Sequence, residues 1–173
     1  MRFNKFFSVM LLSILLGCIP AVYTYWAPSA EGGKLSSGDS GTIAANDHIE
    51  FSFHDVRIQV TGNGTGIGFQ LRVSPERPVS FVSDEVQVYE RQVQAIQKVH
   101  FQVYSIDSPT PTRLYVRPTD TLTGRFFVAD IEFGGAERVE YRVRLPAIKI
   151  GEQVYEIPEI DFTKKKGFGV FGP

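Results

Sequence analysis

Residues 56–73, VRIQVTGNGTGIGFQLRV, decide the fold of this chain. Apolar residues alternate with polar ones on both sides of Gly62-Asn63-Gly64, which is the pattern of a strand with one buried face. Asn-Gly between two alternating segments is the strongest short-range signal for a β-hairpin. The stretch therefore predicts two antiparallel strands joined by a tight turn.

The same alternation recurs on both sides of this hairpin. Upstream, the apolar positions of residues 51–53 and 56–60 are out of phase by one residue, which predicts a β-bulge at His54-Asp55 or, alternatively, a turn there. Residues 80–108 lack Gly and Pro and predict two strands with a turn near 92–95, although part of the segment also fits a helical spacing. Further hairpins are expected at Gly134-Gly135 and at Gly151-Glu152.

About eight or nine short strands separated by turn signals predict an all-β fold, an antiparallel β-sandwich that is immunoglobulin-like in architecture. A barrel is the alternative closure. The sequence divides into an N-terminal hydrophobic membrane segment (1–26), a flexible Gly/Ser/Ala-rich linker (27–46), the β-sandwich domain (47–163) and a basic C-terminal tail (164–173).

The N-terminal residues have the composition of an export signal. Arg2 and Lys5 precede an apolar run, residues 6–16, which ends in Gly17-Cys18. The sequence Leu15-Leu16-Gly17-Cys18 resembles the lipobox of bacterial lipoproteins, in which a peptidase cuts before the cysteine and the cysteine receives lipid. The resemblance implies a lipid on Cys18, the only cysteine of the chain, and a domain tethered on the periplasmic side of the bacterial cell envelope.

Two other interpretations of the N-terminus stay open. Residues 6–26 carry no charge and are long enough for an uncleaved anchor helix, with Tyr23, Tyr25 and Trp26 at the outer interface. Cleavage after Ala30 would instead release a soluble protein. The lipoprotein and the anchor helix both place the body of the protein on the non-cytoplasmic side.

Composition limits the classes of partner. The net charge is −1 and acidic and basic residues are interspersed, so no long-range field would attract nucleic acid. The 14 Phe and 7 Tyr favour strands over helices. About 145 residues remain after the N-terminal segment, enough for one domain that folds without a disulfide or a structural metal.

No set of residues predicts chemistry. His48 and His54 would lie about 20 Å apart on one strand face, too far to bind one metal ion together. His100 has no carboxylate partner that the sequence identifies. Ser40 lies in Gly38-Asp39-Ser40-Gly41, which looks like the nucleophile segment of chymotrypsin-like proteases, but no histidine precedes it and the segment is in the linker. We therefore assign no catalytic, metal-binding or cofactor-binding residue and expect no cofactor.

The C-terminal residues offer a possible interface. Lys164, Lys165 and Lys166 could contact anionic lipid, and Phe168 and Phe171 could dock on a partner. The leading hypothesis is a membrane-tethered, non-catalytic envelope protein whose domain provides a protein-binding or assembly surface. The alternative is a carrier of a small hydrophobic ligand or lipid inside the sandwich or barrel.

Overall fold

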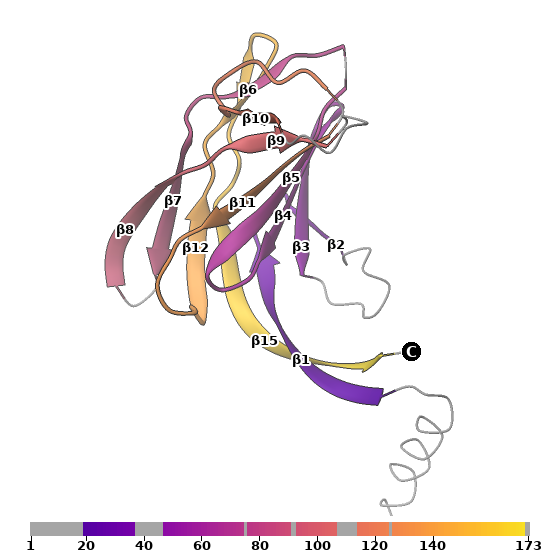
Figure 1. Cartoon of the computed structure of the whole chain (residues 1–173), viewed down its shortest axis with the longest axis vertical. Coiled ribbons are helices and arrows are strands. Elements are labelled where there is room, and N and C mark those ends of the chain that lie inside the picture. Colours follow the sequence, from indigo (N-terminus) through magenta and orange to yellow (C-terminus); the bar gives the residue numbers. More distant parts are fainter. Residues whose placement is uncertain are drawn as a thin grey trace, which may run out of the picture.

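The chain folds as an all-β protein in the computed structural model, and every strand pairing is antiparallel. The structure describes residues 19–36, 47–74, 76–90, 93–106, 114–124 and 126–171. Within these ranges there is no helix, and the sheets are curled (Figure 1). The predicted all-β antiparallel class is therefore confirmed.

The strands in chain order are β1 (Ile19–Ser29), β2 (Lys34–Ser36), β3 (His48–Phe53), β4 (Val56–Gly62), β5 (Gly66–Arg72), β6 (Val79–Phe81), β7 (Glu85–Glu90), β8 (Val93–His100), β9 (Val103–Ser105), β10 (Leu114–Val116), β11 (Phe126–Glu132), β12 (Glu140–Arg144), β13 (Ile148–Ile150), β14 (Gln153–Tyr155) and β15 (Ile160–Phe171).

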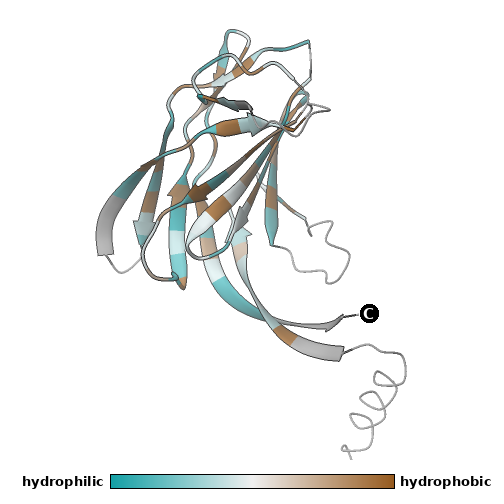
Figure 2. Ribbon diagram, in the orientation of Figure 1, coloured by the Kyte–Doolittle hydropathy of each residue, from teal (hydrophilic) through white to brown (hydrophobic). Residues whose placement is uncertain are grey.

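One large sheet forms most of the molecule. Its strand order is β10-β9-β11-β5-β4-β1-β15-β12-β7-β8, with β3 paired to β4 and β2 paired to β3. A second sheet has the order β14-β13-β6. Because consecutive side chains of a strand point to opposite faces, the strands alternate between apolar and polar residues along their length (Figure 2).

The two sheets share one apolar core. Three phenylalanines meet there: the Phe69 ring of β5, the Phe81 ring of β6 and the Phe101 ring, which follows β8. Their centroids lie 5.6 Å apart for Phe69 and Phe81, 5.6 Å for Phe81 and Phe101, and 6.4 Å for Phe69 and Phe101, all in edge-to-face geometry. This is the arrangement that aromatic quadrupoles favour. The cluster fixes the small sheet against the large one.

Tyr141 of β12 is the largest fully buried side chain. Its ring stacks on Phe162 with centroids 5.0 Å apart, and its hydroxyl donates a 3.2 Å hydrogen bond to the carbonyl oxygen of Gly66. Burial raises the pKa of the Tyr141 hydroxyl, because the charged phenolate would lose its solvation. The neutral phenol therefore holds β12 and β15 against the start of β5.

Three of the predicted hairpin regions are confirmed. β4 and β5 pair from Arg57–Arg72 to Gly62–Ile67 around the Asn63-Gly64 turn. β7 and β8 form two strands in the segment that also fitted a helical spacing. β13 and β14 pair across Gly151-Glu152.

One open alternative is decided in favour of the turn, and one local prediction is wrong. Phe53 pairs directly with Val56, so His54-Asp55 is a tight turn with His54 at φ +56°, and the predicted bulge is absent. The turn accounts for the change of phase, since the chain reverses direction there. The strands on either side of Gly134-Gly135 do not pair with each other: β11 pairs with β5 and β9, whereas β12 pairs with β15 and β7.

The two ends of the described chain lie side by side. β1 and β15 pair over eleven positions, from Ile19–Phe171 to Ser29–Asp161, and the ribbon curves away from the body (Figure 1). Residues 19–26 are thus strand here, rather than the end of a helix, and residues 27–36 of the predicted linker include parts of β1 and β2. Residues 164–171 of the predicted tail are likewise strand, because β1 supplies their hydrogen-bond partners. Among the described residues, no helix is long and apolar enough to cross a membrane.

Trp26 anchors this ribbon to the body. Its indole Nε1 donates a 2.8 Å hydrogen bond to the carbonyl oxygen of Arg138, and its ring lies against the α-carbon of Gly64 in the β4–β5 turn. The Nζ of Lys164 lies 5.2 Å from the ring centroid, within cation–π range. Trp26 is also the only residue of β1 that pairs with β4.

Candidate functional site

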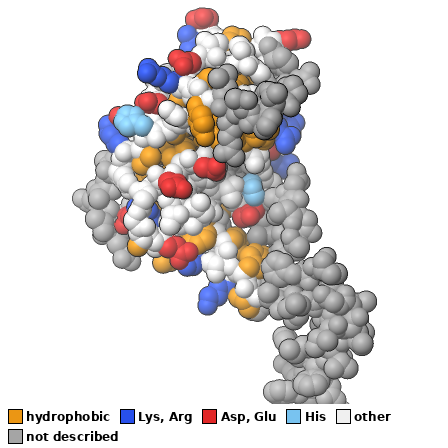
Figure 3. All heavy atoms as spheres, viewed as in Figure 1, with side chains coloured by type: hydrophobic (Ala, Val, Ile, Leu, Met, Phe, Trp, Pro, Cys, Tyr) orange, Lys and Arg blue, Asp and Glu red, His pale blue; other side chains and the backbone are white. Residues whose placement is uncertain are grey.

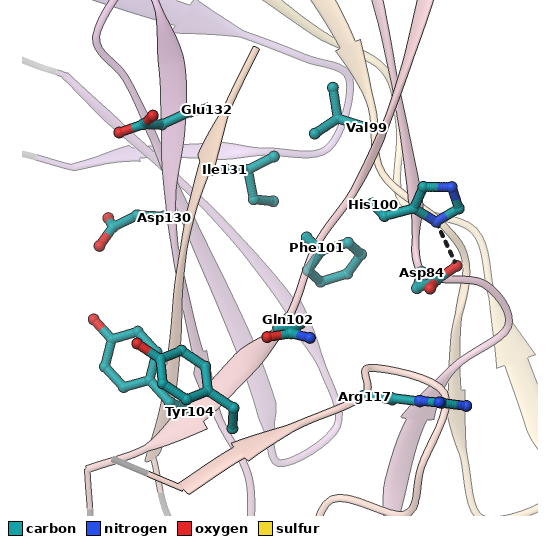
Figure 4. Close-up of a pocket in the computed structure, with 11 residues that line it drawn as sticks. Asp84, Val99, His100, Phe101, Gln102, Tyr104, Arg117, Asp130, Ile131 and Glu132 are labelled. Atoms are coloured by element: carbon teal, nitrogen blue, oxygen red, sulfur yellow. Dashed lines mark ion pairs between the residues drawn. The ribbon is translucent and has the colours of Figure 1, made fainter. Parts of the chain in front are cut away.

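A groove opens between β8 and β11. In the strand order these belong to opposite ends of the large sheet, and the curl of the sheet brings the two ends together. The groove has a volume of about 430 Å³. It is lined by Asp84, Val99, His100, Phe101, Gln102, Tyr104, Tyr115, Arg117, Asp130, Ile131 and Glu132 (Figure 4).

The groove has an apolar floor and a charged rim. Phe101 and Ile131 are buried, and the half-buried Val99 lies beside them. In Figure 4 these side chains lie between Asp130 and Glu132 on the β11 side and His100 and Asp84 on the other. Such a combination suits a ligand that carries apolar groups on one side and charged groups on the other.

The β11 rim exposes backbone groups that have no strand partner. Phe133 donates its N–H to Thr65, next to β5, and Phe126 accepts from Ile106, next to β9, so alternate residues face opposite edges. The N–H and C=O groups of Asp130 and Glu132 therefore point toward the groove. β9 pairs with β11 only at Phe127 and Val128, so within the described chain no strand meets them there.

The β8 rim also exposes backbone groups that have no strand partner. Phe101 donates its N–H to the carbonyl oxygen of Asp84, on the β7 side, so the backbone groups of His100 point the other way, toward the groove. β8 is the last strand of the large sheet and pairs only with β7 among the described strands. Two open strand edges thus flank one apolar floor.

Both ends of the groove are closed. At one end, Tyr104 of β9 pairs with Val128 of β11. At the other end, Gln97 Nε2 donates a hydrogen bond to the carbonyl oxygen of Phe133. Arg138 supports this closure through a 3.2 Å bond to Gln97 Oε1 and a 2.6 Å ion pair with Glu90. The open edge spans residues 129–132 of β11, or about 13 Å at the rise of an antiparallel strand.

The charges of the rim are unevenly placed. His100 Nδ1 lies 3.2 Å from Asp84 Oδ1, and the two side chains are 69% and 41% exposed. Across the groove, Asp130 and Glu132 are exposed, and neither forms an ion pair with another described residue. Acidic and basic side chains are otherwise interspersed over the face that Figure 3 shows. The β11 rim is therefore the locally acidic side of the groove.

The sequence did not indicate a groove between β8 and β11. The sequence identified no carboxylate partner for His100. In the structure Glu85 pairs with His100 across the β7–β8 hairpin, which brings Asp84 next to the imidazole. The register of that hairpin was the available signal. No signal in the sequence related β8 to β11, because their approach depends on the curl of the whole sheet.

The other two histidines each contact one polar side chain. His48 Nδ1 lies 2.6 Å from Asp47 Oδ1, and His54 Nε2 lies 2.7 Å from the Tyr155 hydroxyl. Within the described ranges, no three His, Cys, Asp or Glu side chains are grouped as they would be around a metal ion.

The possible interface residues fall into two groups. Lys164, Lys165 and Lys166 belong to β15, and Phe168 and Phe171 occupy register positions opposite Val22 and Ile19 of β1. All five lie on the ribbon, and none of the three lysines lines the groove. Cys18, the predicted lipidation site, and Ser40 lie outside the described residues.

Comparison of the chain with protein-family models, with curated proteins and with solved structures gave no match.

Proposed function

We propose that this protein is a membrane-tethered, non-catalytic envelope protein whose β-rich body binds an extended segment of a partner protein in the β8–β11 groove. The observation that carries the proposal is the pair of open strand edges across an apolar floor. A peptide in extended conformation offers N–H and C=O groups to such edges and places alternate side chains on the floor.

The rim chemistry indicates which peptide would fit. Alternate residues of the bound segment would be apolar, to cover Phe101 and Ile131. The residues between them would be Lys or Arg, to pair with the exposed carboxylates of Asp130 and Glu132. The length of the open edge limits the segment in the groove to about four residues.

Tethering is supported by the start of the chain. The predicted lipidation site, Cys18, immediately precedes β1, and Ile19 pairs with Phe171 at the end of the ribbon farthest from the Trp26 anchor. A lipid or an apolar helix preceding Ile19 would hold the body on the periplasmic side and leave the groove accessible. An immunoglobulin-like sandwich stays part of the proposal, with the β14-β13-β6 sheet as the smaller layer.

The close packing of the interior favours peptide binding in the groove over the alternative function, which is to carry a hydrophobic ligand between the sheets. The Phe69, Phe81 and Phe101 rings contact one another where the two sheets meet. A lipid placed between the sheets would have to separate these rings and lose their packing. The groove, by contrast, is already open to solvent. The His100 side chain at its rim is 69% exposed and lies 3.2 Å from Asp84, so we take the two as a surface contact and assign them no catalytic role.

A peptide titration tests the proposal. The full chain in detergent is titrated with a fluorescent acetyl-Val-Lys-Val-Lys-Val peptide, and anisotropy gives the Kd. Glu132→Ala removes the rim charge but keeps the backbone N–H, whereas Glu132→Pro removes both without breaking a bond to β5. Glu156→Ala, the same charge change on an exposed residue outside the groove lining, is the control.

We expect Glu132→Ala to weaken binding by up to about fivefold, as for an exposed ion pair. Glu132→Pro should weaken it by a further factor of about 2–12, the value of one hydrogen bond, and Glu156→Ala should leave it unchanged. Equal affinities for the Ala and Pro variants, both folded by circular dichroism, would show that no strand is added. Failure of the wild-type chain to bind the peptide would count against the groove as the site.

A further inference from the structure

The ribbon of β1 and β15 has a free-standing distal half, which we call the arm: residues 19–25 paired with residues 165–171. β4 reaches β1 only at Trp26, and β12 reaches β15 no farther than Thr163. Beyond these points, both outer edges of the arm lack a strand partner among the described residues. Figure 1 shows the arm extending away from the body.

The arm differs in charge from the rest of the protein. Residues 19–29 contain no charged residue, and residues 164–171 contain three lysines and no acid. The whole chain has a net charge of −1, so the chain without these three lysines has a net charge of −4. At its base Lys164 is paired with Glu137 at 2.6 Å. Lys165 and Lys166 are exposed, and neither forms an ion pair with a described residue.

The residues of the arm are also ordered along its length. The register pairs the apolar positions 19–22 with positions 168–171 at the far end. Tyr23 and Tyr25 come next, with ring centroids 5.8 Å apart and the Tyr23 ring over Gly167. Lys166 and Lys165 stand opposite Thr24 and Tyr25, nearer the body. From the bilayer outward to water, apolar residues, then tyrosines and then lysines is the order that a membrane interface favours.

The residues that precede the arm in the sequence also indicate that the arm contacts a membrane. Eighteen residues lie before Ile19, and they include the uncharged apolar run 6–16. We therefore propose that the arm seats on the headgroup layer of a membrane rich in anionic lipid, with Lys165 and Lys166 contacting the lipid phosphates. The arm does not enter the hydrocarbon layer, because its open backbone edges would lose their hydrogen bonds there.

Seating the arm would fix the orientation of the body, which a lipid or a flexible leader does not. Each lysine near an anionic surface changes the seating equilibrium about fivefold, so Lys165 and Lys166 together change it about 30-fold. The contribution depends on lipid charge and falls with added salt. A lipid on Cys18 would depend on neither, so these two dependences separate seating of the arm from tethering by a lipid.

A depth-sensitive fluorescence measurement tests the arm. The full chain is reconstituted in vesicles of zwitterionic lipid, or of the same lipid with about one-third phosphatidylglycerol, and quenched with lipids that carry a nitroxide on the headgroup. Tyr23→Trp reports on the arm, Tyr115→Trp reports on an exposed site of the body, and the wild-type chain with its single Trp26 gives the baseline.

We expect strong quenching of Tyr23→Trp in anionic vesicles, weaker quenching in zwitterionic vesicles, and no quenching of Tyr115→Trp in either. Adding Lys165→Gln and Lys166→Gln should reduce the quenching at position 23 in anionic vesicles to the zwitterionic level. The control pair Lys98→Gln and Lys149→Gln makes the same charge change on the body, where each lysine has an acidic partner, and should leave the quenching unchanged.

Quenching at position 23 that is independent of lipid charge would overturn the proposal, as would quenching that both lysine pairs reduce equally. Absence of quenching in anionic vesicles would overturn it as well. The peptide titration in detergent involves neither lipid charge nor the arm, so the two proposals can fail separately.

Discussion

Replacing Gly64 by alanine would show how strongly Trp26 attaches the ribbon to the body. Gly64 has φ +81°, and a Cβ atom there would meet the Trp26 ring, with Cε2 at 2.7 Å and Cζ2 nearer still. Gly135 has nearly the same backbone angle, φ +78°, but nothing lies within 4 Å of its Cβ position. The two glycines therefore separate the cost of backbone strain from the cost of the steric contact.

The expected magnitudes follow from these two terms. An alanine in the left-handed region costs about 1–2 kcal/mol, which is the full expectation for Gly135→Ala. Gly64→Ala adds the overpacking against an aromatic ring that is itself hydrogen-bonded to Arg138, at about 1–3 kcal/mol. We expect Gly64→Ala to lower the free energy of unfolding by about 2–5 kcal/mol in total.

Urea unfolding of the full chain in detergent, followed by circular dichroism, measures both variants. Trp26→Phe shortens the ring and relieves its contact with the new Cβ. Glu137 Cγ, which would lie 2.9 Å from that Cβ, belongs to a half-exposed side chain that can move aside. In this background Gly64→Ala should therefore cost about as much as Gly135→Ala. Equal costs for the two alanine variants in the wild-type background would refute the reasoning. An unchanged excess cost in the Trp26→Phe background would also refute it, since the strain would then have another source.

Three further changes test the core and the surface. Because burial raises the pKa of Tyr141 above its usual value of about 10, its contribution to stability is complete below that pH and is lost as the pH rises. Tyr141→Phe should cost about 1 kcal/mol at neutral pH and give a shallower alkaline decline in urea titrations between pH 8 and 11.5. Phe81→Ala should cost about 3–5 kcal/mol by the same assay, and a cost below 1 kcal/mol would contradict its place in the core. Arg142→Lys loses the two bonds to Asp161, at 2.9 and 3.0 Å, yet should change stability by less than about 1 kcal/mol, since the pair is half exposed; a larger, salt-independent loss would contradict this.

The local pattern of the sequence was enough to predict the strands and the tight turn between β4 and β5. Alternation located β4 and β5, and Asn63-Gly64 located their turn, because side-chain period and turn chemistry depend only on neighbouring residues. The turn at His54 was harder to predict. A change of phase is compatible with both a bulge and a reversal, and His54 has a positive φ that sequence patterns rarely mark.

These local patterns could not predict the candidate site. Val99, Phe101 and Ile131 were visible as apolar positions, but the sequence did not indicate that they share the floor of one groove. The lysines 164–166 were visible as a basic group, but their place on a paired strand required the other end of the chain. In both cases the residues involved are far apart in sequence.

By itself the sequence determined that this chain is a succession of strands with one apolar face each, joined by tight turns. Only the tertiary structure decided which strands pair: β11 with β5 rather than β12, and β1 with β15 at the two ends of the described chain. The physical reason is that every strand carries the same N–H and C=O groups on both of its edges. The choice of partner therefore depends on how all the apolar faces are buried together, and no local segment specifies it.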